Sequence, residues 1–131
     1  MSTLIYNIIY GGDIIAGEKN LENRLKKWLQ SRGIYPPNTP KQKIKAEPIG
    51  YYEKRFGSTF TINGLPDMHI CIKGHSIDVE LKDVKGKPSR VQLKILDNMN
   101  NWQCEAYLVY PKDWDFITKR IEEVINETGG V

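Results

Sequence analysis

The stretch NGLPDMHICIKGHSIDVELK, which occupies positions 63–82, decides which fold this chain is predicted to adopt. Two runs within it, PDMHICI and HSIDVELK, alternate apolar and polar residues with the period of two that is typical of half-buried strands. The dipeptide Lys73-Gly74 between them suits a two-residue turn, so the stretch predicts a β-hairpin. One face of its first strand would carry Met68, Ile70 and Ile72, and the other would carry Asp67, His69 and Cys71.

This hairpin would bring carboxylates together. With the turn placed as above, Asp67 lies opposite Glu80 and His69 lies opposite Asp78. Opposed Cβ atoms in an antiparallel pair are about 5 Å apart, and two unpaired carboxylates at that separation destabilise a fold. A hard divalent cation bound by both, at roughly 2.1 Å for Mg²⁺, would remove the repulsion. The hairpin therefore predicts a metal site, and Asp78 could either bind a second cation or pair with His69.

Lys82 shares the strand face of Glu80 and Asp78. Its ammonium could contact a scissile phosphate or position an attacking water beside the metal. A metal ion neutralises the charge that develops on a phosphodiester during hydrolysis and lowers the pKa of a bound water. Two carboxylates, a cation and a lysine are therefore a set of groups suited to phosphodiester hydrolysis.

The residues before the hairpin predict a helix, a loop and two strands. In GEKNLENRLKKWLQSRG the apolar residues recur at helical spacing, and they are Leu21, Leu25, Trp28 and Leu29. Gly33 is a suitable helix end. The basic, proline-rich segment 35–50 predicts an extended loop, and YYEKRF predicts a strand. The apolar residues of segment 1–17 predict a further N-terminal strand. We do not expect a signal peptide there, because the segment lacks a basic leader.

The residues after the hairpin predict a helix, a strand and a helix. Ser89 is a good helix N-cap, and Gln92 three positions later completes a capping-box pattern. The run EAYLVY is apolar almost throughout, which is typical of a strand buried on both faces, and Asp113 begins a last amphipathic helix. The order α-β-β-β-α-β-α, with the extra N-terminal strand, predicts an α/β fold in which helices flank a mixed central sheet.

Length and composition predict a single domain over residues 1–131. Hydrophobic residues make up 40% of the 131, enough to bury one core. Cys71 and Cys104 lie in apolar runs without metal-site spacing, so we expect buried free thiols in a reducing compartment. The sequence has no uncharged apolar run long enough to span a bilayer, and we therefore expect a cytoplasmic protein with no membrane partner.

The formal net charge of +3 at pH 7 is small, but the charges are unevenly distributed. Basic residues gather on both sides of the acidic hairpin, which suits a polyanionic substrate. The residues for which we predict contacts with DNA phosphates are Lys54, Arg55, Lys85, Lys87 and Arg90.

The pair PD at positions 66–67, the run ELK at positions 80–82 and Gln92 on the following helix together resemble the signature of the PD-(D/E)xK nucleases. More closely, GLPDMHICIKGHSIDVELKDVKGKPSRVQ is similar to the phage-type VRR-NUC domain, a branch similar to the archaeal Holliday-junction resolvases. The resemblance runs from about position 18 to the final helix. It implies a single VRR-NUC-like domain with a restriction-endonuclease-like core.

The resemblance also implies roles for individual residues. Asp67 and Glu80 would bind Mg²⁺ or Mn²⁺ with help from the backbone carbonyl of Leu81, and Lys82 would be the catalytic lysine. Gln92 would support the site from its helix, a role that is compatible with its place in the capping box.

A glutamate on the first helix would complete the acidic cluster. Helical phase leaves two candidates open, since Glu18 follows the stripe of Leu21 and Leu25 whereas Glu22 lies on its edge. Counting back from the glycine that ends the helix, as in the resolvases, favours Glu22, and Glu18 is the alternative.

The activity implied is that of a metal-dependent DNA endonuclease that hydrolyses phosphodiester bonds in branched or structured DNA, with Holliday-junction resolution as one form of it. Two alternatives stay open: a nuclease for flap, nicked or linear duplex DNA, and a non-catalytic DNA-binding accessory subunit. Paired incisions across a junction require two active sites, so the resolvase form implies a homodimer. The resemblance also implies a phage or prophage origin in a bacterial host.

Overall fold

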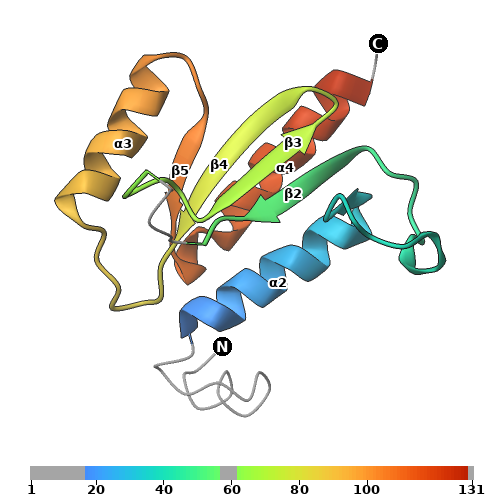
Figure 1. Cartoon of the computed structure of the whole chain (residues 1–131), viewed down its shortest axis with the longest axis horizontal. Coiled ribbons are helices and arrows are strands. Elements are labelled where there is room, and N and C mark those ends of the chain that lie inside the picture. Colours follow the sequence, from blue (N-terminus) through green and yellow to red (C-terminus); the bar gives the residue numbers. More distant parts are fainter. Residues whose placement is uncertain (1–16, 57–61, 130–131) are drawn as a thin grey trace.

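The computed structural model describes residues 17–56 and 62–129. They form an α/β fold with a five-stranded mixed sheet in the order β1-β2-β3-β4-β5 (Figure 1). The strands are β1 (Ile34–Tyr35), β2 (Gly50–Lys54), β3 (Met68–Ile72), β4 (His75–Leu81) and β5 (Ala106–Val109). The helices are α2 (Gly17–Ser31), α3 (Arg90–Asn101) and α4 (Trp114–Gly129), with short 3-10 turns at η2 (Lys41–Lys43) and η3 (Pro111–Asp113). None of the described helices is long and apolar enough to cross a membrane.

The predicted order of elements is confirmed over this part of the chain, with β1 as an addition. The N-terminal strand predicted for segment 1–17 lies outside the described residues, apart from Gly17, which begins α2. The helix ends just before Gly33, as predicted.

The hairpin of β3 and β4 forms as the alternation predicts, and its turn fixes the register. Lys73 has a φ of 48° and Gly74 a φ of 90°. Positive φ at both central residues is the mark of a type I′ turn, whose twist matches that of the strands it joins. His69 therefore lies opposite Asp78, as predicted, and Met68 lies opposite Val79. Since the ladder ends at Met68, Asp67 lies immediately beyond the last pair.

Helices α2 and α4 share one hydrophobic core with the sheet. The alternate residues of β3 are fully buried, whereas His69 and Cys71 between them are half-buried. The helix residues that join this core are Leu21, Leu25, Leu29, Ile117, Ile121 and Val124. Helix α3 packs beside β5, where the Asn100 side chain donates to the Ala106 carbonyl at 2.8 Å and accepts from the Ala106 N–H at 3.0 Å. The apolar face predicted for the first helix is confirmed.

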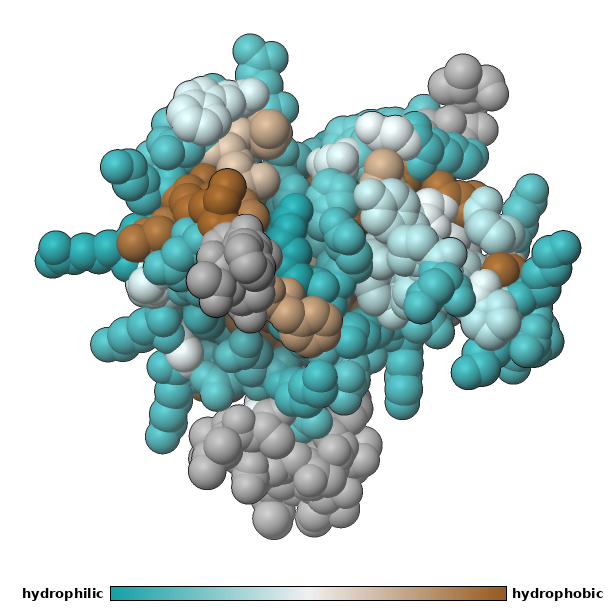
Figure 2. Space-filling model, viewed as in Figure 1, coloured by the Kyte–Doolittle hydropathy of each residue, from teal (hydrophilic) through white to brown (hydrophobic). Residues whose placement is uncertain are grey.

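The loop that precedes β3 rests on α3. Gly64 has a φ of 91°, and a Cβ at this position would lie 2.6 Å from Cγ1 of Val91 and 3.0 Å from Cδ1 of Ile95. A residue with a side chain could not approach the helix so closely. In Figure 2, apolar side chains gather over α3, where Val91 and Leu93 are exposed. The contact places the Pro-Asp end of the hairpin beside the first turns of α3.

Two expectations about the C-terminal strand and the cysteines are wrong. Strand β5, which pairs with β4 at one edge of the described sheet, is not fully buried on its two faces, since Tyr107 and Leu108 are half-buried. Cys104 is exposed and Cys71 is half-buried, and both are free. Cys104 lies in the turn between α3 and β5, outside the strand that its apolar neighbours suggested.

The basic loop 35–50 is folded around Tyr35. The Tyr35 hydroxyl accepts from the N–H of Lys45 at 3.2 Å and of Ala46 at 2.9 Å, and it lies 3.0 Å from the Ala46 carbonyl, to which it donates. Strand β1 pairs parallel to β2, with Ile34 opposite Gly50. A strand of two residues that pairs across a long loop leaves no local periodicity, which is why the sequence did not predict it.

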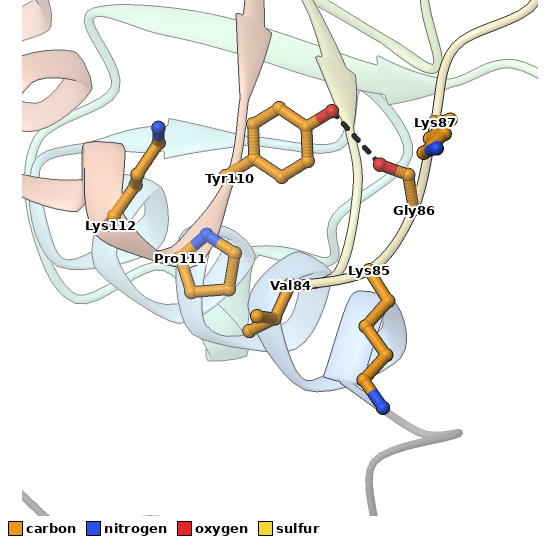
Figure 3. Close-up of a pocket in the computed structure, with 7 residues that line it drawn as sticks. All are labelled: Val84, Lys85, Gly86, Lys87, Tyr110, Pro111 and Lys112. Carbon is orange, nitrogen blue, oxygen red and sulfur yellow. Dashed lines mark hydrogen bonds between the residues drawn. The ribbon is translucent and has the colours of Figure 1, made fainter.

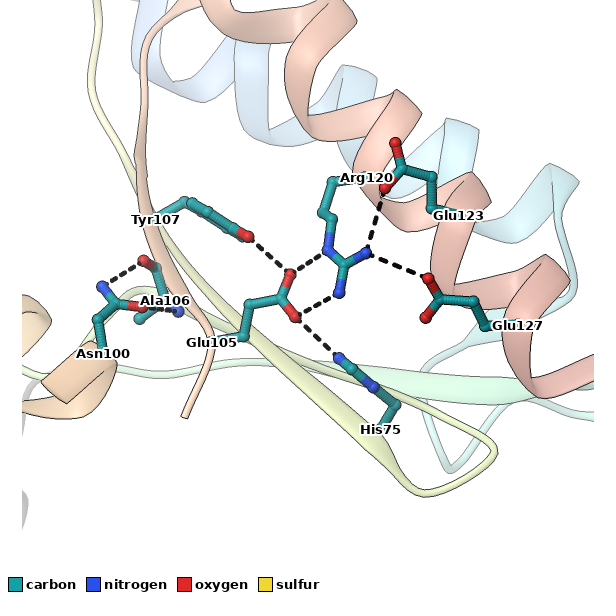
Figure 4. Close-up of polar contacts among 8 residues, drawn as sticks. All are labelled: His75, Asn100, Glu105, Ala106, Tyr107, Arg120, Glu123 and Glu127. Carbon is teal, nitrogen blue, oxygen red and sulfur yellow. Dashed lines mark hydrogen bonds and ion pairs between the residues drawn. The ribbon is translucent and has the colours of Figure 1, made fainter. Parts of the chain in front are cut away.

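A network around Glu105 joins the start of β5 to β4 and α4 (Figure 4). The two Glu105 oxygens accept from Arg120, at 2.6 Å from Nε and 2.9 Å from Nη2. Tyr107 donates its hydroxyl to Glu105 at 2.7 Å, and His75 Nε2 lies 2.9 Å from it. The hydrogen bonds from Arg120 outweigh burial and lower the pKa of Glu105 to about 2. The carboxylate is therefore ionised at neutral pH and holds three elements together.

We expect Glu105→Gln to destabilise the fold at pH 7 by about 2 kcal/mol, because it leaves the half-buried guanidinium of Arg120 without its bidentate partner. That corresponds to a fall in Tm of roughly 8 °C. Because the folded-state pKa lies below the unfolded one, this stabilisation is present above about pH 4.5 and is lost as the pH falls toward 2. Thermal melts of both proteins should converge in acid. The control is Glu123→Gln, which removes a half-exposed partner of Arg120; equal Tm losses in the two variants would contradict the prediction.

Candidate metal centre at the end of the hairpin

Pro66 interrupts the hairpin ladder where the predicted ligands meet. Continued beyond its last pair, Met68 with Val79, the register would set Pro66 opposite Leu81, and proline has no N–H to donate to the Leu81 carbonyl. The Leu81 N–H donates instead to Oδ2 of Asp67 at 2.9 Å, and the Pro66 carbonyl accepts from Nη1 of Arg55 at 3.0 Å. The N–H and C=O of one strand residue point to the same side of the strand. Because the Leu81 N–H points toward Asp67, the Leu81 carbonyl points toward the same side, where Pro66 offers it no ladder hydrogen bond.

Glu80 is the most deeply buried acid of the site, with 1% of its surface exposed. Its Oε2 accepts from Nε2 of Gln92 at 3.2 Å and lies 3.6 Å from Nζ of Lys82. Its Oε1 is also buried and has no hydrogen-bond partner among the residues that the structure describes. Burial first, and the neighbouring Asp67 second, raise the pKa of Glu80 to about 8.

The two carboxylates fit a divalent cation. When Asp67 and Glu80 are both ionised, each offers the other acceptor oxygens and no donor, so their contact is unfavourable without a shared proton or a cation. Within residues 17–56 and 62–129, no group of three or more His, Cys, Asp or Glu side chains is arranged to hold a metal ion. Two carboxylates suffice for Mg²⁺, which keeps several waters and is commonly completed by substrate phosphates. The Leu81 carbonyl offers a third oxygen.

Gln92 acts both as a helix cap and as a partner of Glu80. Its Oε1 accepts from the Ser89 N–H at 2.8 Å, while Oγ of Ser89 accepts from the Gln92 N–H at 3.1 Å, which completes the predicted capping box. Because its oxygen is taken by the cap, the Gln92 amide can only present its NH₂ group to Glu80. The start of α3 thus fixes the orientation of the buried carboxylate.

Lys82 follows the last residue of β4 and stays beside the site. Its N–H donates to the Val109 carbonyl at 3.0 Å, which extends the pairing with β5 by one residue. The side chain is 15% exposed, and its ammonium faces Oε2 of Glu80. Lys82 is therefore held next to the acid pair, with part of its side chain open to solvent.

Glu22 is buried but is neutralised by lysines. Its oxygens lie 2.7 Å from Nζ of Lys54, 2.9 Å from Lys19 and 3.0 Å from Lys26. Burial opposes its charge, but these hydrogen bonds outweigh burial and lower the pKa of Glu22 to about 2. Because three lysines already neutralise this carboxylate, binding a metal ion would bring it little further stabilisation. The spacing of Lys19 and Lys26 from Glu22, three and four residues, is a sequence signal for such pairing.

Glu18, one turn earlier on α2, is the glutamate that the structure couples to the acid pair. Its pKa is raised by burial and then by the charge of Asp67, and its own charge in turn raises the pKa of Glu80. Lys82 and Lys54 oppose this effect. The acidic neighbourhood of Asp67 and Glu80 therefore includes Glu18, whereas Glu22 is connected to Asp67 only through Lys54, which lies between the two carboxylates.

We expect Glu22→Gln and Glu18→Gln to differ in kind. Glu22→Gln should lower the metal-free stability by about 2 kcal/mol, because it leaves the half-buried Lys54 ammonium beside a neutral group. Glu18→Gln should leave the metal-free Tm unchanged or higher, since it removes a charge that burial and Asp67 disfavour, and should reduce the rise in Tm that MgCl₂ or MnCl₂ produces. Calorimetry of both variants with EDTA and with metal measures this. The reverse pattern would show that Glu22, and not Glu18, is the α2 glutamate that supports metal binding.

Lys54 and Arg55, predicted to contact DNA, have partners within the protein. Lys54 pairs with Glu22 as described and lies 3.9 Å from Oδ1 of Asp67. Nη1 of Arg55 lies 2.7 Å from Oδ1 of Asp78, and His69 Nδ1 lies 3.1 Å from the same oxygen. Asp78 thus pairs with His69, which is one of the two alternatives that the sequence left open. The sequence did not predict that Arg55 would also pair with Asp78. These contacts position the loop around Pro66 and leave Asp78 well compensated.

The other basic residues predicted to contact DNA are exposed: Lys85 and Lys87 lie on the segment between β4 and α3, and Arg90 is the first residue of α3. This segment connects Lys82 to the helix that carries Gln92, so its charges border the acid pair.

Comparison of the chain with protein-family models, with curated proteins and with solved structures gave no match.

Proposed function

We propose that the protein is a metal-dependent DNA endonuclease of the PD-(D/E)xK type, close to VRR-NUC domains, which hydrolyses phosphodiester bonds in branched or structured DNA. The observation that carries the proposal is the buried Glu80 carboxylate, one oxygen of which has no hydrogen-bond partner among the described residues, together with Asp67, Gln92 and Lys82 around it. A buried glutamate next to a half-buried aspartate, beside a lysine at the end of two strands, is unfavourable as a purely structural feature and is well suited to binding a cation.

Asp67, Glu80 and the Leu81 carbonyl would hold Mg²⁺ or Mn²⁺, and Glu18 would add negative charge from α2. The bound ion would supply neutralisation of the phosphate charge and a lower pKa for an attacking water. Pro66 contributes by leaving the Leu81 carbonyl without a ladder donor, and the Leu81 N–H contributes by fixing the Asp67 carboxylate.

Lys82 and Gln92 have distinct roles in this proposal. The Lys82 ammonium contacts a non-bridging oxygen of the scissile phosphate or a water aligned for attack, and it stabilises the charge that grows on the phosphate. Gln92 does not touch the substrate and keeps Glu80 in place through its NH₂ group. By resemblance to the family, the products would carry a 5′-phosphate and a 3′-hydroxyl. Resolution of a Holliday junction would further require a homodimer.

The test is the cleavage of end-labelled four-way junction, flap, nicked and linear duplex DNA by the full chain in Mg²⁺, Mn²⁺ or EDTA. We expect cleavage with either metal and none with EDTA. Symmetric cuts in the junction would identify a resolvase. Preference for flap or nicked DNA would support the proposed nuclease activity and assign it a different substrate. Tight binding without cleavage in either metal would contradict the proposal and favour an accessory DNA-binding subunit.

A further inference from the structure

A pocket of about 550 Å³ opens beside the candidate centre, between the segment that follows β4 and the residues that follow β5 (Figure 3). Its walls touch the centre directly. A Cβ on Gly86 would lie 3.3 Å from Cβ of Lys82, so the backbone of the pocket packs against the proposed catalytic lysine. The Tyr110 hydroxyl donates to the Gly86 carbonyl at 2.9 Å and ties the two sides of the pocket together.

The middle of the pocket is apolar and aromatic. Figure 3 shows the Tyr110 ring, Pro111 and Val84 grouped at its centre. Val84 is 77% exposed, so its apolar surface is open to contact with a ligand. Flat apolar surfaces of this kind are suited to the face of a nucleobase or to a deoxyribose.

Three lysines surround this centre: Lys85, Lys87 and Lys112. All three are exposed, and in the described part of the chain none of them has a carboxylate within ion-pair distance, in contrast to Lys54. Nζ of Lys112 lies 5.8 Å from the centre of the Tyr110 ring, so a phosphate bound by Lys112 would place its nucleoside close to that ring. Lys112 comes from η3, far along the chain from the other two, and no sequence motif marked it.

We infer that this pocket binds one unpaired nucleotide of the substrate strand next to the scissile phosphate, with its phosphates on the lysines and its base against Tyr110, Pro111 and Val84. The inference rests on the proposed function for its place in the reaction, and it names the substrate class as DNA with an unpaired nucleotide beside the cut. A base that is stacked and paired in a duplex could not enter a pocket of this shape without leaving its stack. The volume is within the range of pockets that hold small ligands.

The test measures binding without cleavage. Fluorescence anisotropy of labelled dT8, and of an oligomer of eight abasic deoxyribose phosphates, is recorded with the full chain in EDTA over a series of salt concentrations. We expect dT8 to bind about tenfold more tightly than the abasic oligomer because of stacking. Lys112→Ala should weaken dT8 binding several-fold and reduce the slope of log K against log[salt] by about 0.7, whereas Lys119→Ala, an exposed lysine on α4, should change neither.

Equal affinity for the two oligomers, or equal behaviour of Lys112→Ala and Lys119→Ala, would overturn the pocket assignment. These outcomes are separate from those of the nuclease test. A chain that binds dT8 as expected but cuts no DNA would support the pocket and overturn the nuclease. If the protein cuts structured DNA but Lys112→Ala binds dT8 like the wild type, the pocket assignment is wrong and the nuclease proposal stands.

Discussion

Asp67→Asn and Lys82→Ala should each reduce the rate of DNA cleavage at least about a hundredfold while leaving the fold intact. Removing one group that stabilises the charged transition state typically slows a reaction by about two to three orders of magnitude. Asp67→Asn keeps the shape of the side chain and an oxygen that can accept from the Leu81 N–H, but it removes the charge that a divalent ion needs. Lys82→Ala removes the ammonium without disturbing the backbone bond to Val109.

The two variants should fail for different reasons, which single-turnover rates over a range of MnCl₂ concentrations will separate. Asp67→Asn should require much more metal, because it loses a ligand. Lys82→Ala should reach its low rate at the same metal concentration as the wild type, because the ion is still held. Asp97→Asn and Lys119→Ala, both exposed on helices away from the acid pair, serve as matched controls. Undiminished cleavage in Lys82→Ala would assign the chemistry to another group.

The features of the site that the sequence predicts are those fixed by local rules. The alternation in β3 and β4 decides which side chains share a face, and the two-residue turn decides the register, so His69 opposite Asp78 follows from the chain alone. The capping box of Ser89 and Gln92 is likewise local. Placing Gln92 against Glu80 also needed the docking of α3, which the resemblance supplied and the periodicity did not.

The features that the sequence missed depend on how distant elements dock. Which turn of α2 meets the end of the hairpin decides between Glu18 and Glu22, and helical phase cannot resolve a choice between two residues four apart on one helix face. Lys54 ends β2 and Arg55 follows it, and acids from α2 and β4 form ion pairs with both. In the same way, the apolar run of β5 does not reveal that the strand lies at the edge of the described sheet.

Without metal, the wild-type protein should lose stability as the pH rises from about 4.5 to about 8, and Glu80→Gln should remove this part of the loss. The pKa of Glu80 in the folded protein is raised to about 8, above the value of 4.5 for an exposed glutamate. The folded state therefore holds a proton that the unfolded chain releases first. The contribution is fully present below pH 4.5 and is lost as the pH rises through 8.

The glutamine variant isolates this effect because it has the shape of the protonated acid and no titratable group. Above pH 8 it should exceed the wild type in stability by an amount on the order of 3 kcal/mol, the scale of an uncompensated buried charge. The expected gain in Tm is roughly 10 °C. Below pH 4.5 the two melts should coincide, since both side chains are then neutral.

Added metal should reverse the order of the two proteins, because an ion that binds the folded state alone stabilises it by mass action. A bound Mg²⁺ or Mn²⁺ would replace the Glu80 proton, so the rise in Tm of the wild type should be larger at pH 8 than at pH 6 and should be accompanied by proton release in an unbuffered titration. Glu80→Gln, which cannot supply the charge, should show little rise at either pH. Parallel melts of the two proteins across the whole pH range in EDTA would mean that Glu80 is compensated by a partner inside the fold, and the observation on which the metal centre rests would then be lost.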